Sequence, residues 1–361
     1  MGATEFALGD ALAVQRWSLS LAREAEVRQY FRKFMGKGPD ALIKVQTELN
    51  KQAGEKITVA LRMKLSGDGI EGDNAIEGTS AEESLTFHND ALFIDQRRKG
   101  TKSKGKMSEQ RVPYNMRKEG RDALAIWYAE DYDQQIMFYL AGARGVDTSF
   151  HVGTSWTGRA NNSLQSPDSD HILYGGTASS KATVSTTDDM SLNILERLVA
   201  KAETSDPMIQ AFMIDGEKHF VLLMHTFQAF ALRTSTSSND WLEITKMAGP
   251  RGGKNNLFLN ALGSYGGIIM HKHRNVIRFS DYGSGGALAA ARALFLGAQA
   301  GMIAWGGGSA YGRYSWNEET DDRGNALAIT AGTIYGAKKS RYNSADFGVI
   351  AVDTYAVDPN A

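Results

Sequence analysis

The sequence predicts an α+β fold, because helical and strand-like segments are interspersed without the regular βαβ repeat of a doubly wound sheet. Two segments carry this prediction. Residues 57–65 alternate strictly between apolar and polar side chains, as in a strand with one buried face. Residues 114–141 instead repeat apolar side chains at every fourth position, as in a long amphipathic helix. A chain of 361 residues can bury roughly 75% of its unfolded surface.

The first 50 residues predict a helix, an aromatic cluster and a short strand. Asp10 is expected to cap an amphipathic helix that is closed by Gly36. Tyr30 and Phe31 begin the aromatic cluster just before this glycine, and aromatic side chains on a terminal segment usually dock onto another surface. Residues 41–48 have the pattern of a short strand.

Residues 57–96 carry the most informative pattern of the chain. A second strand-like segment, residues 85–94, follows the first, and its apolar phase changes at Asn89 and Asp90, which predicts a β-bulge or a bend. Residues 66–84 between them have no helical or strand periodicity and are too long for a hairpin turn. They contain no Lys or Arg and six carboxylates, those of Asp68, Glu71, Asp73, Glu77, Glu82 and Glu83. We therefore expect a projecting strand pair that another protein surface completes.

A basic run follows this strand pair and leads into the long helix. Residues 97–106 hold six positive charges, those of Arg97, Arg98, Lys99, Lys102, Lys104 and Lys106. The run lacks the interleaved aromatic residues that stack on bases, so we interpret it as a solvated patch that faces a protein partner. Ser108 is expected to cap the following helix, and Gly142 to end it.

The remaining elements follow from local patterns. Residues 143–187, rich in Gly, Ser, Thr, Asn and Asp, predict a long surface loop. The other expected elements are a helix at 189–202, strands at 208–214 and 217–224 joined by an Asp-Gly turn, a helix at 226–233, a strand at 264–277, at least one buried strand within 288–305, a helix or strand at 325–336 and a closing strand at 347–357.

Composition excludes several classes of protein. The net charge of −1 gives no overall basic excess for nucleic-acid binding, and the absence of cysteine excludes disulfides, thiolate metal sites and a cysteine nucleophile. The first residues lack the basic and apolar regions of a secretory signal. The apolar run 286–306 contains Arg292 near its middle, which would cost roughly 3 kcal/mol in a bilayer, so we expect buried core there.

No motif has the spacing of a catalytic site. Residues 249–255 resemble a phosphate-binding loop, but they are one residue too short and end in Asn; residues 283–288 lack the third glycine of a dinucleotide-binding loop. His271 and His273 could bind zinc or copper, and the acidic residues of 318–322 could bind calcium or magnesium, but we favour surface histidines and a solvated acidic turn. We expect no catalytic residue, cofactor or metal.

What remains is surface suited to protein contacts. The acidic projection and the basic run at its base suit head-to-tail contact between copies, because complementary charge steers association and sets register. The residues predicted to contact neighbouring subunits are Asp68, Glu71, Asp73, Glu77, Arg97, Arg98, Lys99, Lys102, Tyr30 and Phe31.

Five sequence blocks resemble the major capsid proteins of N-four-like tailed phages, a family similar in turn to the Hong Kong 97-type capsid fold. The blocks are residues 54–67, 105–111, 121–124, 293–300 and 339–349, and the resemblance covers the chain from about residue 9 to its end. It implies an N-terminal arm (1–50), an extended loop (51–106), a peripheral domain with a long spine helix (107–190), an axial domain (191–314) and a return to the peripheral domain (315–361). Residues 143–187 do not match the family pattern.

The resemblance implies a structural protein that self-assembles into hexamers and pentamers of an icosahedral phage head around double-stranded DNA. Its partners would be other copies of itself, a portal, possible scaffolding or decoration proteins and DNA bound without sequence specificity, and no membrane. It would assemble in the bacterial cytoplasm and end in the virion. Two alternatives stay open: a cytosolic metal-dependent hydrolase that uses His271, His273 and the acids of 318–322, and an encapsulin-type compartment of the same fold.

Overall fold

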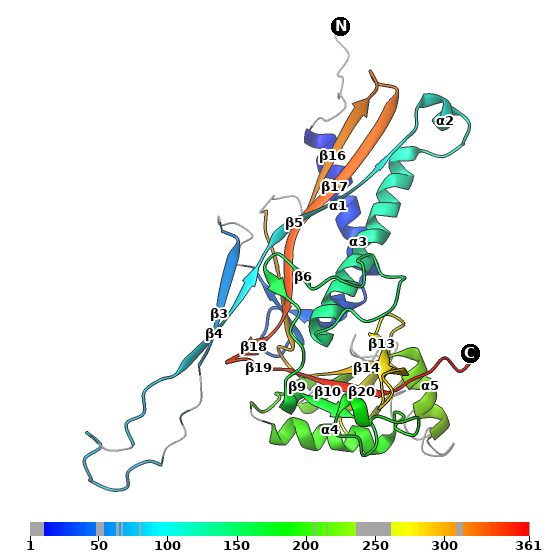
Figure 1. Cartoon of the computed structure of the whole chain (residues 1–361). Coiled ribbons are helices and arrows are strands. Elements are labelled where there is room, and N and C mark those ends of the chain that lie inside the picture. Colours follow the sequence, from blue (N-terminus) through cyan, green and yellow to red (C-terminus); the bar gives the residue numbers. More distant parts are fainter. Residues whose placement is uncertain are drawn as a thin grey trace.

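The computed structural model describes residues 11–47, 54–62, 65, 68–78, 81–205, 207–214, 216–235, 261–307 and 313–360. An elongated body and a compact body lie one above the other, and a strand pair projects sideways from their junction (Figure 1). The predicted helix cap Asp10 and the glycine-rich residues 249–255 lie outside the described residues.

The elongated body is a six-stranded sheet with a long helix packed against it. In spatial order its strands are β1 (Met35–Gly36), β2 (Ile43–Gln46), β15 (Gly301–Trp305), β17 (Ala326–Lys339) and β16 (Tyr314–Asp321), with β5 (Asp95–Lys102) also paired to β17. Helix α3 (Met116–Ala141) packs its tyrosines against β17: Tyr128 donates to the carbonyl of Ala331 at 2.6 Å, and the Tyr132 hydroxyl lies 2.8 Å from Thr333 Oγ1. At 1.5 Å per residue, this helix is about 39 Å long.

The ends of α3 show which capping residues define it. Asn115 caps its start, because the Asn115 side chain accepts from the backbone N–H groups of Arg117 and Lys118. The predicted cap, Ser108, instead lies within the separate short helix α2 (Lys106–Gln110). Gly142 ends α3 as predicted, in the left-handed conformation with φ 65°. The N-terminal helix α1 (Ala11–Arg28) and the 3-10 helix η1 (Phe31–Phe34) precede the sheet.

The compact body is an eight-stranded sheet covered by two helices. Its strands are β11 (Gly263–Tyr265), β12 (Ile268–Lys272), β10 (Glu217–Met224), β14 (Leu288–Leu296), β20 (Val349–Tyr355) and β8 (Ile172–Tyr174), with β9 (Phe212–Ile214) on β10 and β13 (Arg278–Tyr282) on β14. Helices α4 (Leu192–Thr204) and α5 (Thr226–Ser235) bury apolar side chains such as Leu195, Leu198 and Leu232 against this sheet. The Asp-Gly hairpin between β9 and β10 is confirmed, with Gly216 at φ 87°.

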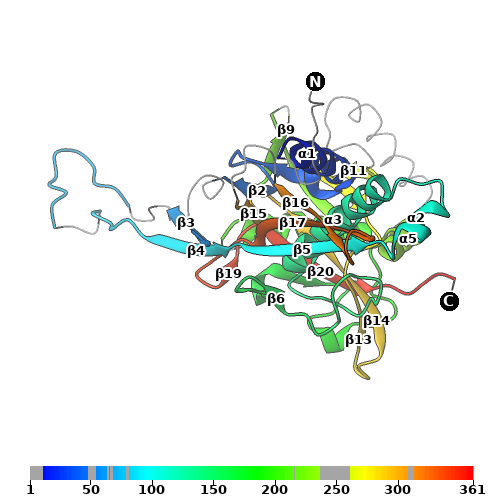
Figure 2. The same ribbon diagram turned by 90° about the horizontal axis from the view of Figure 1, so that it is seen from above.

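The projecting strands β3 (Lys56–Arg62) and β4 (Phe87–Phe93) form an antiparallel hairpin that extends well away from the body (Figure 2). Ile57 and Leu92 anchor its base by packing on Met302 and Ala304 of β15. The predicted bulge is wrong, because the register runs unbroken from Lys56 opposite Phe93 to Arg62 opposite Phe87. The apolar phase changed because Phe87 is exposed and not because the backbone is irregular.

Residues 143–187 are not simply a surface loop. They contain the small hairpin β6 (Gly158–Arg159) and β7 (Asn162–Ser163), the 3-10 helices η3 (Ser169–His171) and η4 (Lys181–Thr183), and strand β8, which pairs in parallel with β20. The predicted strand 264–277 is also wrong, because Gly266 and Gly267 form a turn between β11 and β12. A last hairpin joins β18 (Arg341–Tyr342) and β19 (Ala345–Asp346).

The predicted boundaries around residue 314 do not follow the sheets. β15, within the predicted segment 191–314, pairs with β2 and β17 in the elongated sheet, whereas β20, within 315–361, lies between β14 and β8 in the compact sheet. Similarly, β5 lies within the predicted loop 51–106 but belongs to the elongated sheet. The chain therefore crosses repeatedly between the two bodies.

One buried arginine connects the two bodies. Arg292 of β14 forms an ion pair with Asp353 of β20 at 2.6 Å, and its other guanidinium nitrogen donates to the carbonyl of Ala141 at the end of α3. Tyr282 donates to the same aspartate at 2.6 Å. The apolar run 286–306 is thus buried strand core, and among the described residues no helix is long and apolar enough to span a membrane.

Candidate intersubunit surfaces

The acidic loop, residues 66–84, presents charge and apolar surface to solvent. Asp68, Glu71, Asp73 and Glu77 are all exposed. The hydrogen bonds to Asp68 and Glu82 are local, from the backbone N–H groups of Gly69 and Gly78. No helix or strand occurs in the described part of the loop. Exposed carboxylates grouped on one loop repel one another, so the loop favours a cationic partner.

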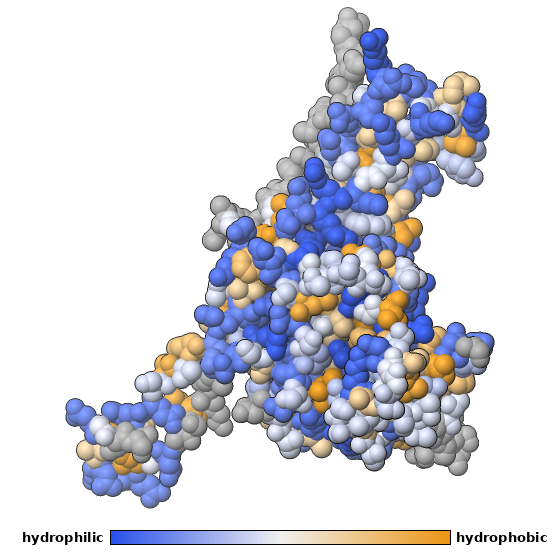
Figure 3. Space-filling model, in the orientation of Figure 1, coloured by the Kyte–Doolittle hydropathy of each residue, from blue (hydrophilic) through white to orange (hydrophobic). Residues whose placement is uncertain are grey.

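Large apolar side chains are exposed on the same projection. Leu65, Ile76, Leu85 and Phe87 keep 54–59% of their surface exposed. Apolar patches lie among the polar residues of the projection at the lower left of Figure 3. Soluble monomers rarely present grouped apolar side chains on a thin extension that has no core of its own. The hairpin with its loop is therefore a surface suited to contact with another protein.

The predicted basic run is a strand and not an irregular patch. Residues 95–102 form β5, which pairs with residues 328–335 of β17. Arg98, Lys99 and Lys102 are exposed, although Lys102 also lies 2.6 Å from Asp321 of its own chain. Lys99 lies over the ring of Trp127, with 5.5 Å between its ammonium and the ring centroid. Three of the four predicted basic contact residues are thus accessible to a neighbour.

Arg97 differs because its charge is used within the subunit. Its guanidinium forms an ion pair with the buried carboxylate of Asp131 at 2.5 Å, and Tyr335 and Gln135 donate to that same carboxylate. Burial lowers the pKa of Arg97, but the Asp131 carboxylate outweighs it and holds the pKa above its usual value. Arg97 therefore ties β5 to α3.

The aromatic cluster packs largely inside its own chain. Phe31 is fully buried in the main core, while Tyr30 is partly exposed. Both carboxylate oxygens of Asp133 accept backbone N–H groups, from Tyr30 at 2.8 Å and from Phe31 at 3.1 Å. Burial raises the pKa of Asp133 to about 7, against the opposing effect of these two donors. Asp133 thus fixes the junction between α1 and η1.

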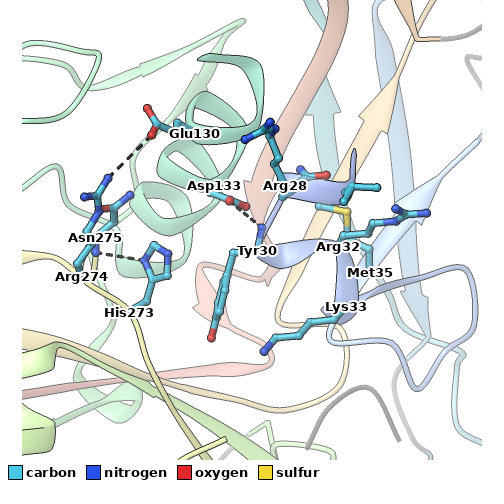
Figure 4. A pocket seen from close by; sticks show the side chains of 12 residues that line it. Arg28, Tyr30, Arg32, Lys33, Met35, Glu130, Asp133, His273, Arg274 and Asn275 are labelled. Carbon is cyan, nitrogen blue, oxygen red and sulfur yellow. Dashed lines mark hydrogen bonds and ion pairs between the residues drawn. The ribbon is translucent and has the colours of Figure 1, made fainter. Parts of the chain in front are cut away.

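A cavity of about 830 Å³ lies beside this junction, between the N-terminal segment, α3 and the loop after β12 (Figure 4). Tyr30, Lys33 and His273 line it together with Arg28, Arg32 and Arg274. Burial lowers the pKa of Lys33 to about 8, and burial with the nearby positive charges of Arg274 and Lys33 lowers the pKa of His273 to about 4. The cavity wall mixes these cations with Glu130 and Asp133, so it has no single-sign field.

The predicted metal site is not assembled. His271 is buried against Tyr30 and Phe34, with its Nδ1 3.3 Å from Lys33 Nζ, so it is not a surface histidine either. The acidic residues 318–321 lie on β16 of the other sheet, where Glu318 is bound by Arg117 at 2.9 Å and is mostly buried. Among the residues that the structure describes, no three His, Asp or Glu side chains come together to hold a metal.

Several important contacts join segments that lie far apart in the sequence. Asp131 and Asp133 lie two residues apart on α3 and bind different segments. Asp131 forms an ion pair with Arg97 of β5, whereas Asp133 accepts the backbone N–H of Tyr30, just before η1. Arg159 donates to the carbonyls of Asp95 and Tyr335 and so joins the β6–β7 hairpin to β5 and β17. The two aspartates flank Tyr132 of the apolar stripe, and this was the available signal, because carboxylates that become buried need such partners.

Comparison with known proteins gives the family and the fold of the chain. A family described as "Phage capsid protein" matches residues 5–358. The major capsid protein of Pseudomonas phage KPP25 is 28% identical over 93% of each chain. The capsid of Ralstonia phage GP4 is 40% identical, with a TM-score of 0.87 over the whole of both chains. The capsid of cyanophage Pam1 shares the fold at 19% identity, with a TM-score of 0.71 over 98% of this chain and 96% of the other.

Proposed function

This chain belongs to the phage capsid protein family and is a phage major capsid protein of the Hong Kong 97-type fold, and from that premise we propose that head-to-tail contacts between the acidic loop and β5 join its subunits. The family assignment favours this structural role over the hydrolase alternative, and the two halves of the site that a hydrolase would need lie in different sheets. The same family assignment favours a phage head over an encapsulin-type compartment.

The observation that carries the proposal is the distribution of charge in one chain. The acidic loop extends far from the body, whereas β5, which carries the exposed cations, begins at the base of the hairpin and runs in the opposite direction (Figure 1). A loop that points away from its own cations can meet the equivalent cations of the next copy. Repeating this heterologous contact around an axis closes a ring, as a hexamer or pentamer requires.

Residue roles follow from accessibility. Asp68, Glu71, Asp73 and Glu77 of one subunit face Arg98, Lys99 and Lys102 of its neighbour in this proposal, while Tyr30 offers a partly exposed ring beside the α1–η1 junction. Arg97 and Phe31 support these surfaces from inside the subunit. Exposed Ile76 and Phe87 add apolar area to the contact.

The wider assembly completes the proposal. The elongated body with α3 acts as the peripheral domain, the compact body as the axial domain around the local symmetry axis, and residues 1–50 as the arm. Hexamers and pentamers form an icosahedral head that contains double-stranded DNA and one portal, with scaffolding or decoration proteins as further partners. Assembly occurs in the host cytoplasm, and the protein has no enzymatic role.

Charge reversal tests the contact. We expect Arg98→Glu with Lys99→Glu to abolish the shells, tubes or sheets that the wild-type protein forms when expressed alone, as seen by negative-stain microscopy. The subunit should keep its melting temperature, because both side chains are exposed. Adding Asp73→Lys with Glu77→Lys should restore assembly.

A matched control changes the net charge equally elsewhere. Lys37→Glu with Lys218→Glu alters two exposed lysines outside the proposed contact and should leave assembly intact. Normal shells from the β5 reversal would contradict the proposed contact. Failure of the wild-type protein to assemble under any condition would contradict the proposed self-assembly.

A further inference from the structure

One edge of β5 is open. Among the described residues, β5 pairs only with β17, and its other side has no strand from Gln96 to Lys102. Long strands with an open edge invite pairing with another chain, so proteins normally cover or shorten them. β5 has eight residues, and it contains no proline that would block pairing.

The register identifies the backbone groups at this edge. Ser103 N–H donates to the carbonyl of Leu327 at 2.8 Å, and the ladder places these two residues directly opposite each other. In an antiparallel pair, such hydrogen-bonded positions alternate with positions whose N–H and C=O point away. The groups that point outward therefore belong to Gln96, Arg98, Gly100 and Lys102.

The same side of the β4–β5 ribbon is already used nearer the hairpin. Ile94 N–H donates to the carbonyl of Glu55 at 2.9 Å, so even-numbered residues up to 94 face β3. The open edge of β5 thus begins beyond the N-terminal end of β3 and lies on the same side of the β4–β5 ribbon as β3. An incoming strand would meet a vacant position beside β5 that is not occupied by the described part of its own chain.

Charge identifies the occupant. Arg98 and Lys102 stand at outward positions, with the exposed Lys99 between them. The acidic loop carries six carboxylates, no cation and no helix or strand of its own in its described part. In its own subunit this loop lies far from β5, as both views show (Figures 1 and 2).

We propose that the acidic loop of a second copy adds to the open edge of β5 as a strand. The inference rests on the proposed head-to-tail contact and specifies its form. Backbone hydrogen bonds to Arg98, Gly100 and Lys102 supply affinity, and the carboxylates fix register against the cations. The elongated sheet of each subunit then continues into its neighbour.

Two substitutions at one position separate backbone pairing from charge. Arg98→Ala removes the cation and keeps the outward N–H, whereas Arg98→Pro removes both but leaves the β17 ladder intact. Gly100 is unsuitable, because a Cβ there would lie 2.8 Å from Thr330 Oγ1.

Loss of one backbone hydrogen bond weakens each contact between subunits about fivefold, and the effect multiplies around a ring. We expect Arg98→Pro shells to be at least about tenfold fewer than Arg98→Ala shells. Equal yields would overturn the inference, while wild-type shells would still support the proposed function.

Hydrogen exchange of wild-type protein gives an answer that needs no variant. On assembly, amides in the peptide 95–103 and in the acidic loop should both become protected by at least about tenfold, because strand pairing protects both partners. The inference is overturned if either segment exchanges equally fast in shells and in free subunits. A photo-crosslinker at exposed Ile76 identifies the occupant: cross-links to 95–103 of another copy support the inference, and cross-links confined to other segments overturn it.

Discussion

Asp133 makes the stability of the free subunit depend on pH in an unusual direction. Its carboxylate is buried, and its pKa rises to about 7 from an ordinary value of 3.8. The folded subunit therefore holds a proton that the unfolded chain releases between these two values. The contribution of Asp133 to stability is complete below the unfolded pKa and is lost as the pH rises through the folded pKa.

The expected magnitude follows from the same two values. At 1.36 kcal/mol for each pH unit, the whole displacement corresponds to at most about 4 kcal/mol, of which roughly 2.5 kcal/mol falls between pH 5 and pH 8. Asp133→Asn cannot titrate, although it loses one of the two backbone acceptors and about 1 kcal/mol at every pH. Wild-type protein should thus lose roughly 2.5 kcal/mol relative to Asp133→Asn from pH 5 to pH 8.

Urea unfolding of dilute, unassembled subunits at half-unit pH intervals measures this difference. Glu119→Gln, on the exposed side of the same helix, is the control and should run parallel to wild type. Parallel curves for wild type and Asp133→Asn would refute the reasoning. A free energy of unfolding that rises with pH for wild type relative to Asp133→Asn would show that the predicted direction of the pH dependence is wrong.

Three further predictions concern the folded subunit. Arg292→Ala leaves the buried Asp353 carboxylate without its cation and should cost about 3–5 kcal/mol, measured by urea unfolding; a loss below 1 kcal/mol would be inconsistent with the buried pair. Gly142→Ala forces a side chain into the left-handed region with its Cβ 2.0 Å from the carbonyl of Gln165, and it should lower the yield of folded protein or cost more than about 2 kcal/mol. Leu92→Ala should cost about 2–4 kcal/mol because Leu92 is buried at the hairpin base, whereas Phe87→Ala on the same strand should cost under about 0.5 kcal/mol in free subunits and still slow assembly; equal costs would contradict the assignment of their faces.

Local patterns predicted the elements in which the spacing of neighbouring residues along the chain shows which face is buried. β3 alternates strictly because only one face of the hairpin packs on β15, and α3 shows its stripe because one side lies on β17. The helix end at Gly142 and the hairpin turn at Gly216 could be predicted, because the positive φ values at these positions favour glycine. The exposure of the acidic loop also followed from its composition.

Contacts between distant segments could not be read from the sequence. β5 has no apolar alternation, because its stability comes from its ladder with β17 and from Arg97 on Asp131. β8 is only three residues long and depends on β20, which lies far along the chain. Asn115 and Ser108 are both good helix caps by residue type, but Asn115 caps α3 whereas Ser108 lies inside α2. Phe31 looked available for docking because its buried environment comes from remote residues.

The Arg292 side chain limits how a shell built from this protein can change shape. It is buried and binds Asp353 and the last turn of α3 at once. Breaking either contact in the buried interior is costly, so Arg292 resists separation of the end of the long helix from the compact sheet. Any flexing of the subunit then falls to parts outside this connection, such as the projecting hairpin.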